Sequence, residues 1–297
     1  YGERAHQTVH LVRTLLDQVS IAGARIEAAG AVTRLANLLC AMDAAPEESS
    51  AWPPLQLAGT ALADRAQSGS VHALADRGRQ IALLLRDRLT RDSWRAIHRP
   101  FTPFVPGDPD SMADACDSMV ERFAALGRLI SDGMSHGTAW YFLDMGQCLE
   151  RGSMILQAAQ AMTDGAATSE ELSALLDLVD GQSHYRSRYL AAPTFAPVLD
   201  FVLLDPAQPR GLAFQIARIE QHLAALPVLR EDGMLDPPLR KTRQLLAHIA
   251  GIDAEQADDT TIHELRAALS DISDAIAGSY FLQDEGPAAK DAASFLA

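Results

Sequence analysis

The chain has 297 residues, of which 48% are hydrophobic and 22% charged, and its formal net charge is −14 at pH 7. A chain with this acidic excess repels the phosphates of nucleic acids and the headgroups of anionic membranes. No segment approaches the ~18 consecutive apolar residues that a membrane span requires. We therefore expect neither nucleic acid nor a membrane as a partner.

The cysteine usage bears on the compartment. Cys40, Cys116 and Cys148 are odd in number, widely spaced and free of any Cys-x-x-Cys motif. The sequence therefore indicates neither a disulfide framework nor a thiolate metal site. This usage fits a reducing compartment, and we expect a cytoplasmic protein. Because a helical pattern starts at Tyr1 without a capping residue, we also expect further residues to precede it.

Apolar residues at intervals of three and four predict amphipathic helices along the first part of the chain. In the first of them, Ala5, Val9, Val12 and Leu16 form one face. The expected helices cover 1–17, 21–42, 55–66 and 70–90, followed by a short turn at 93–98. The segment 100–110 holds four prolines, so we expect a loop there.

Helical patterns resume after this proline-rich loop. The expected helices of the second part cover 111–133, 138–162, 168–180, 195–204, 209–226, 237–250 and 261–283. Thr168 and Glu171 have the spacing of a capping box at the start of one of them. No alternating pattern indicates a β-strand. The predicted fold class is therefore all-α, a multi-helix bundle of about ten helices.

A repeated Glu-Arg dipeptide suggests that the bundle consists of two pseudo-repeated halves packed together. Glu3-Arg4 and Glu150-Arg151 both stand in amphipathic helices. We divide the chain into a first helical half, the proline-rich loop, a second helical half and a loosely held tail, and we expect these parts to form one structural unit. Their ranges are 1–99, 100–110, 111–285 and 286–297.

The Glu-Arg dipeptides have two interpretations. Neighbouring residues on a helix project about 100° apart, so Glu and Arg of one dipeptide must find partners on another helix. One interpretation is a swapped set of interior ion pairs, Glu3 with Arg151 and Glu150 with Arg4, which clamps the halves together. The other is a guanidinium-lined cleft for an anionic ligand.

A second group of charged and aromatic residues lies at the end of the helix at 70–90 and just after it. Arg86 and Asp87 end this helix, and Trp94 and Arg95 come shortly after it. Part of the run has the spacing of an ordinary solvated helix face. Trp94 beside Arg95 also offers a surface on which a planar group can stack.

Two further groups lie in the second half. Tyr185, Arg186 and Arg188 end one helix, and Asp205 and Arg210 flank the expected start of the next. Free N–H groups at a helix start favour an anion, so this last pair suggests a ligand site. A helix-capping turn is the alternative.

Two motifs resemble catalytic or metal sites by spacing alone. Glu3, His6 and His10 have the Glu-x-x-His spacing of carboxylate-bridged di-iron bundles, but no further acidic helices accompany them, so we expect no metal. Residues 133–137 match the Gly-x-Ser-x-Gly hydrolase pattern, but no strand precedes them, and we expect a loop between helices. The remaining histidines, including His98, His222 and His248, are scattered, and we expect surface or capping positions for them. No nucleotide fingerprint is present, and we expect no cofactor.

Taken together, the motifs resemble the bacterial alpha-E family, an all-helical domain named for its Glu-Arg motif. The matching stretches are 1–5, 86–95, 146–151, 185–189 and 205–215, so the resemblance spans nearly the whole chain. The sequence departs from the family at Gln147, Gly152, Gln208 and Gly211, where the family tends to have Arg, Ala, Asn and Ser.

The resemblance implies a function, although no catalytic residue is established for the family. Such domains are companions, adjacent or fused, of circularly permuted ATP-grasp ligase-like proteins in systems that make or process peptide-like amide bonds. The leading hypothesis is a non-catalytic helical partner domain that binds the ligase-like protein and helps to hold an acidic peptide or small anionic substrate. The alternative is an independent enzyme that uses Glu3 or Glu150 as acid or base on an anionic substrate.

The candidate ligand-binding residues come from all these groups. They are Glu3, Arg4, Arg86, Asp87, Trp94, Arg95, Glu150, Arg151, Tyr185, Arg186, Arg188, Asp205, Arg210 and Gln215.

Overall fold

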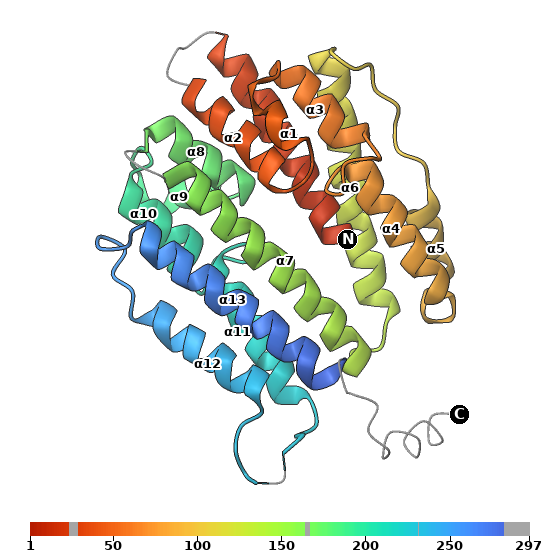
Figure 1. The fold of residues 1–297 in the computed structure, drawn as a ribbon, viewed down its shortest axis with the longest axis vertical. Coiled ribbons are helices and arrows are strands. Elements are labelled where there is room, and N and C mark those ends of the chain that lie inside the picture. The colour runs from red at the N-terminus through yellow and green to blue at the C-terminus, as the bar shows by residue number, and fades with distance from the viewer. Residues whose placement is uncertain (24–28, 164–166, 231, 282–297) are drawn as a thin grey trace.

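The computed structural model describes residues 1–281 except 24–28, 164–166 and 231. Over this part of the chain it contains thirteen α-helices and no β-strand, which confirms the all-α fold class (Figure 1). The first helices are α1 (Gly2–Ala22), α2 (Ala29–Ala41), α3 (Pro54–Ala63), α4 (Val71–Leu84), α5 (Arg91–His98) and α6 (Pro109–Gly133). The others are α7 (Thr138–Thr163), α8 (Ser169–Leu178), α9 (Gln182–Tyr189), α10 (Phe195–Leu199), α11 (Leu212–Ala225), α12 (Pro237–Ala250) and α13 (Asp259–Tyr280).

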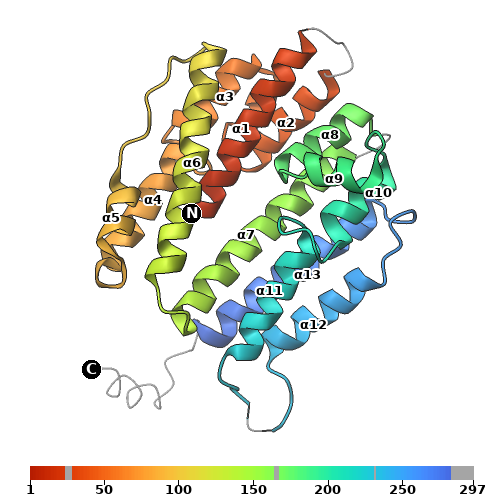
Figure 2. The same cartoon turned by 180° about the vertical axis from the view of Figure 1, so that it is seen from behind.

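Two long helices form the centre of the bundle. Helix α1 packs against α2, α3, α4 and α6, and α7 packs against α8, α11 and α13. The two helices also contact each other, and α2 contacts both. Figures 1 and 2 show from opposite sides that α1–α6 lie on one side of α7 and α11–α13 on the other, while α8 contacts α1, α2 and α7. The contact between α1 and α7 therefore lies where the two groups of helices meet.

The hydrophobic core follows the predicted helix faces. Ala5, Val9 and Val12 of α1 are fully buried, and Leu16 is nearly so. One continuous apolar cluster extends from Ala5 in α1 to Ile276 in α13. Burial of one Leu or Ile side chain contributes about 1.5–3 kcal/mol, so this cluster is the main source of stability.

Helix starts follow the expected capping chemistry in several places. At the start of α8, the Thr168 hydroxyl accepts from the Glu171 N–H, and the Glu171 carboxylate accepts from the Thr168 N–H, which confirms the predicted capping box. Pro237 stands in the first turn of α12, where its missing N–H costs no hydrogen bond. The proline-rich loop ends at Pro109, which opens α6.

Other boundaries differ from the prediction. The helix expected from 209 begins only at Leu212, because Asp205 accepts from the Ala207 N–H and the Gly211 N–H donates to the Gln208 carbonyl, so the chain turns before the helix starts. The helix expected at 195–204 is α10 followed by a π-helical turn. Helix α5, expected only as a short turn, and α9, which lies outside the expected ranges, raise the number of helices above ten.

Two expectations concern the organisation of the chain: its division at the proline-rich loop and the pseudo-repeat of two halves. Helix α6 belongs to the second half by sequence but packs against α1 and α5. The pseudo-repeat and the division at the proline-rich loop stay predictions. The expected tail, 286–297, lies outside the described residues.

None of the described helices combines the length and the hydrophobicity needed to cross a membrane.

Candidate functional site

The two Glu-Arg dipeptides are joined by swapped ion pairs between α1 and α7. The Arg4 guanidinium donates through Nε and Nη2 to the two carboxylate oxygens of Glu150, at 2.9 and 2.8 Å. The Arg151 guanidinium donates in the same way to Glu3, at 2.7 and 2.8 Å. Parallel pairs of this kind are the strong form of the Arg–carboxylate interaction. The predicted pairing is therefore confirmed.

The two pairs differ in burial. The Glu3 side chain is 10% exposed and its partner Arg151 34%. Glu150 is 31% exposed and Arg4 46%. The expectation of two interior pairs is thus wrong for the Arg4–Glu150 pair, which lies near the surface. Hydrogen bonding to Glu150 nevertheless raises the pKa of Arg4, so this guanidinium stays charged at neutral pH.

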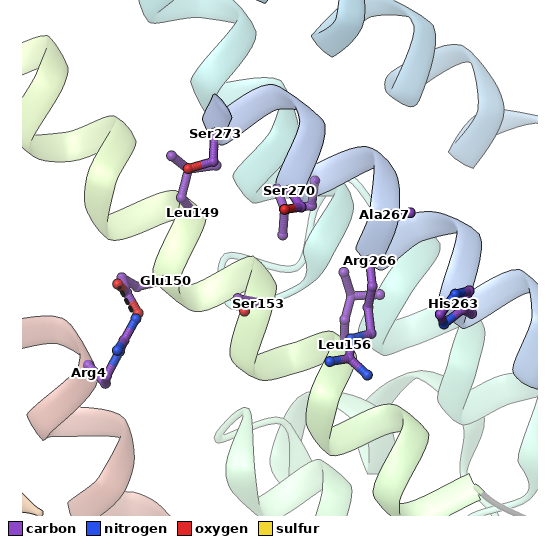
Figure 3. A pocket seen from close by; sticks show the side chains of 11 residues that line it. Arg4, Leu149, Glu150, Ser153, Leu156, His263, Arg266, Ala267, Ser270 and Ser273 are labelled. Carbon is purple, nitrogen blue, oxygen red and sulfur yellow. Dashed lines mark hydrogen bonds and ion pairs between the residues drawn. The ribbon is translucent and has the colours of Figure 1, made fainter. Parts of the chain in front are cut away.

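Each pair lines a different cavity. The Arg4 cavity, about 460 Å³, is lined by Arg4 and Glu150 on one side and by α13 residues including His263 and Arg266 on the other (Figure 3). The Arg151 cavity, about 230 Å³, is lined by Glu3 and Arg151 with further residues of α1, α7 and the segment before α11. Glu3 and Glu150 both line a third, mostly apolar cavity of about 430 Å³, but neither Arg4 nor Arg151 lines it, so none of the three cavities collects all four residues of the motif.

A histidine pair lies in the wall of the Arg151 cavity. His6 Nε2 and His10 Nε2 are 3.0 Å apart, and Arg13 Nη2 is 3.2 Å from His10 Nδ1. Burial lowers the pKa of His6 to about 4 and that of His10 to about 2. The nearby guanidinium group of Arg210 acts in the same direction on both. Both rings are therefore neutral at pH 7.

These contacts replace the metal site that the Glu-x-x-His spacing resembles. The Glu3 carboxylate is occupied by Arg151, and the two histidine rings face each other through their Nε2 atoms. Throughout the described ranges, no group of three or more His, Cys, Asp or Glu side chains is arranged to hold a metal ion.

Arg210 joins this site from a distant part of the chain. Its Nη1 lies 2.7 Å from Asp180 Oδ2. The other carboxylate oxygen of Asp180, Oδ1, accepts from Arg13 Nη2 at 3.4 Å. Gln215, another candidate residue, is fully buried and donates to the Pro209 carbonyl at 2.7 Å, which fixes the segment that carries Arg210. Gln215 is therefore a positioning residue for this segment.

Asp205 does not join Arg210 as the sequence suggested. Its carboxylate pairs with Arg188 and accepts from the Ala207 N–H. Tyr185 is buried and its ring packs against that of Tyr189, whose hydroxyl donates to Asp200 at 2.7 Å. These contacts connect α9 to the turn before α11. Arg186 is exposed.

The group around Trp94 forms a separate surface feature. The Arg86 guanidinium carbon lies 4.3 Å from the centre of the Trp94 ring, and His98 also packs on that ring. Arg86, Asp87 and Arg95 are all exposed. In both views α5 and α9 lie on opposite sides of the molecule (Figures 1 and 2). The structure therefore does not bring the α5 group and the α9 group together.

A buried ionic cluster between α7 and α11 was not predicted from the sequence. Asp144, only 6% exposed, accepts from Arg218 through both carboxylate oxygens and lies 2.6 Å from His222 Nε2. His222 stacks on Tyr141 and is itself buried, so the surface position expected for it is wrong. Asp144 stands next to Met145 on the apolar face of α7, and this was the signal that could have revealed the cluster.

The other two histidines and the Gly-x-Ser-x-Gly motif fulfil the expectations. His98 Nδ1 lies 2.9 Å from the Trp94 carbonyl, close to the end of α5, and His248 is about half exposed. Residues 133–137 span the junction between α6 and α7, so the motif is a connection between helices.

The fold and the site define an all-helical domain whose two Glu-Arg dipeptides hold its central helices together. Residues 1–281 match the Alpha-E family, described as a predicted alpha-helical domain with a conserved ER motif. The chain belongs to this family.

Relatives of this chain occur in mycobacteria. An uncharacterized protein of Mycobacterium bovis and two of Mycobacterium tuberculosis are each 25% identical to it over 209 residues. The match covers 64% of this chain and 23% of each relative, so it spans about a quarter of their length. No solved structure matches the chain significantly.

Proposed function

We propose that the protein is a non-catalytic helical partner domain of a circularly permuted ATP-grasp ligase-like protein, in a system that forms peptide-like amide bonds. Its role is to bind the ligase-like protein and to hold an acidic ligand through its arginines. The observation that carries the proposal is that Glu3 and Glu150 are each bound through both carboxylate oxygens by an arginine.

A catalytic carboxylate must be able to reach the proton that it transfers. In this protein both oxygens of Glu3 and both oxygens of Glu150 accept from a guanidinium. Glu3 and Glu150 both line one further cavity of about 430 Å³, but most of its lining is apolar, and each carboxylate keeps its guanidinium partner there. This arrangement favours a structural role for the Glu-Arg motif.

The comparison of lengths supports a role within a larger assembly. In the mycobacterial relatives the matching segment is accompanied by much additional chain. A helical unit that occurs with other segments is typical of a domain that serves a partner. The ligase-like identity of that partner rests on the family resemblance.

Native mass spectrometry of the tagged protein from its own host tests the proposal. The expected result is a complex that contains a circularly permuted ATP-grasp protein, and the Arg266→Gln variant should form the same complex. Isolation of the chain without this protein, together with a ligation or hydrolysis activity of the chain alone, would contradict the proposal.

The alternative, an independent enzyme that acts on an anionic substrate, is supported by the exposure of Glu150 beside a sizeable cavity. The Glu150→Gln variant separates the two functions. For a partner domain, activity of the complete system should persist as long as the complex forms. If activity disappears while folding and complex formation are unchanged, Glu150 is catalytic and the partner proposal fails.

A further inference from the structure

The lining of the Arg151 cavity combines two kinds of side chain. Arg151, Arg210 and His6 contribute polar groups, whereas Met154 and Ile155 of α7, together with residues at the end of α8, contribute apolar ones. With a volume of about 230 Å³ the cavity accommodates a group of the size of one amino acid. A mostly apolar lining with a few polar groups is the usual arrangement of a site for a small molecule.

Both guanidinium groups retain donors for a ligand. Arg151 uses Nε and Nη2 on Glu3, and the contact of Arg210 with Asp180 uses Nη1. Because a guanidinium carries five N–H donors, each arginine has a further amino group available. The neighbouring carboxylates thus hold the two arginines in position and leave some of their N–H donors available.

The histidine pair supplies a third hydrogen-bond donor, and the contacts of the two rings determine which nitrogen carries each proton. Arg13 can only donate, so His10 Nδ1 must accept from it and the proton of neutral His10 must lie on Nε2. His10 Nε2 then donates to His6 Nε2. Neutral His6 therefore carries its proton on Nδ1, and this N–H is available to a ligand in the cavity.

The charges around the cavity favour a single negative charge on the ligand. Arg13, Arg151 and Arg210 are opposed by Glu3 and Asp180, which leaves one positive charge in excess. A second carboxylate near Arg13, that of Asp117, is 65% exposed and lies at 3.6 Å, so water screens it. Both histidines are neutral and add no charge.

We propose that the Arg151 cavity binds the carboxylate of an apolar amino acid derivative, alone or at the C-terminus of a peptide. The carboxylate lies between Arg151 and Arg210 and accepts from His6, and the apolar side chain packs against Met154 and Ile155. This proposal rests on the ligand-holding part of the proposed function and defines the site and the ligand class for it.

Isothermal titration calorimetry of the full chain with N-acetyl-L-leucine tests the proposal. N-acetyl-L-leucinamide, which lacks the negative charge, is the matched control ligand. We expect the acid to bind at least about tenfold more tightly than the amide, because charge-assisted hydrogen bonds are worth roughly twice neutral ones. Equal affinities, or no binding of the acid, would overturn the proposal. Tighter binding of inorganic phosphate than of the acid would overturn the ligand class.

Variants locate the site. Arg210→Gln should weaken binding of N-acetyl-L-leucine about tenfold or more, and its fold should persist because Asp180 keeps its contact with Arg13. The double variant Glu3→Gln with Arg151→Gln removes the second arginine without leaving a lone buried carboxylate. Arg266→Gln, in the Arg4 cavity, is the control and should bind like the unaltered protein. Unchanged binding in both cavity variants would refute the assignment.

The two proposals fail separately. If the acid binds and Arg210→Gln weakens it, but no ATP-grasp protein is found in the native complex, only the partner proposal is wrong. If the complex forms but the acid binds no better than the amide, only the ligand site is wrong.

Discussion

Arg151 and Glu3 are 148 positions apart in the sequence, yet they are joined by two parallel hydrogen bonds of 2.7 and 2.8 Å. The pair fixes how α1 lies against α7, since each helix carries one partner of both ion pairs. Its near-duplicate, Arg4 with Glu150, has almost the same geometry but is more exposed. The two pairs therefore allow the effect of burial to be measured within one protein.

We predict that Arg151→Ala lowers the free energy of unfolding by about 2–4 kcal/mol, because it leaves the largely buried Glu3 carboxylate without its guanidinium partner. This range is below that of a fully buried pair because a third of the Arg151 side chain is exposed. Arg4→Ala should cost about 1 kcal/mol or less, since its partner Glu150 stays hydrated. Urea unfolding of the two variants checks this difference. Equal losses would show that burial does not decide the strength of these pairs.

The histidine pair predicts a pH dependence of stability. In the folded protein the pKa values of His6 and His10 are lowered to about 4 and about 2, from the ordinary 6.5. Between these folded values and 6.5 the unfolded chain binds more protons than the folded one, so stability falls as the pH is lowered through this window. Above pH 6.5 the contribution of the pair is fully present and constant.

Urea unfolding at several pH values between 5 and 7 measures this effect, in a range where most carboxylates stay ionised in both states. The unaltered protein should lose stability steadily below pH 6.5. The His10→Gln variant should show a shallower slope, because one of the two titrating groups is gone. An identical slope in the variant would mean that other groups cause the pH dependence.

The buried cluster at the α7–α11 contact predicts a strong effect of Asp144. Asp144→Ala leaves the Arg218 guanidinium and the buried His222 without their acceptor, and we expect a loss of about 2–4 kcal/mol in the free energy of unfolding. Asp144→Asn keeps one acceptor oxygen and should cost less. The thermal midpoints of the two variants give the test. A larger loss for Asp144→Asn than for Asp144→Ala would mean that the hydrogen bonds accepted by this side chain do not stabilise the cluster.

The sequence predicted most of the helices, and it offered the pairing of the Glu-Arg dipeptides as one of two interpretations, because both follow from local rules. Apolar periodicity defines the buried face of α1, and the geometry of adjacent helical residues requires Glu3 and Arg4 to find partners elsewhere. The Asp144 cluster was missed because its members, on α7 and α11, meet only when the helices pack. The position of Arg210 beside Asp180 depends on a turn whose course local propensity does not specify.

The cysteines provide a last test, of the packing around α6 and α7. Burial raises the pKa of the Cys116 and Cys148 thiols to about 12, so neither forms the reactive thiolate at pH 8. Cys40 is only partly buried, and it should react alone with a thiol reagent in the native protein. Denaturation should make all three reactive. The Cys40→Ala variant is the control, and it should lose the native reaction. A fast reaction that persists in this variant would show that the contacts of α6 or α7 open in solution.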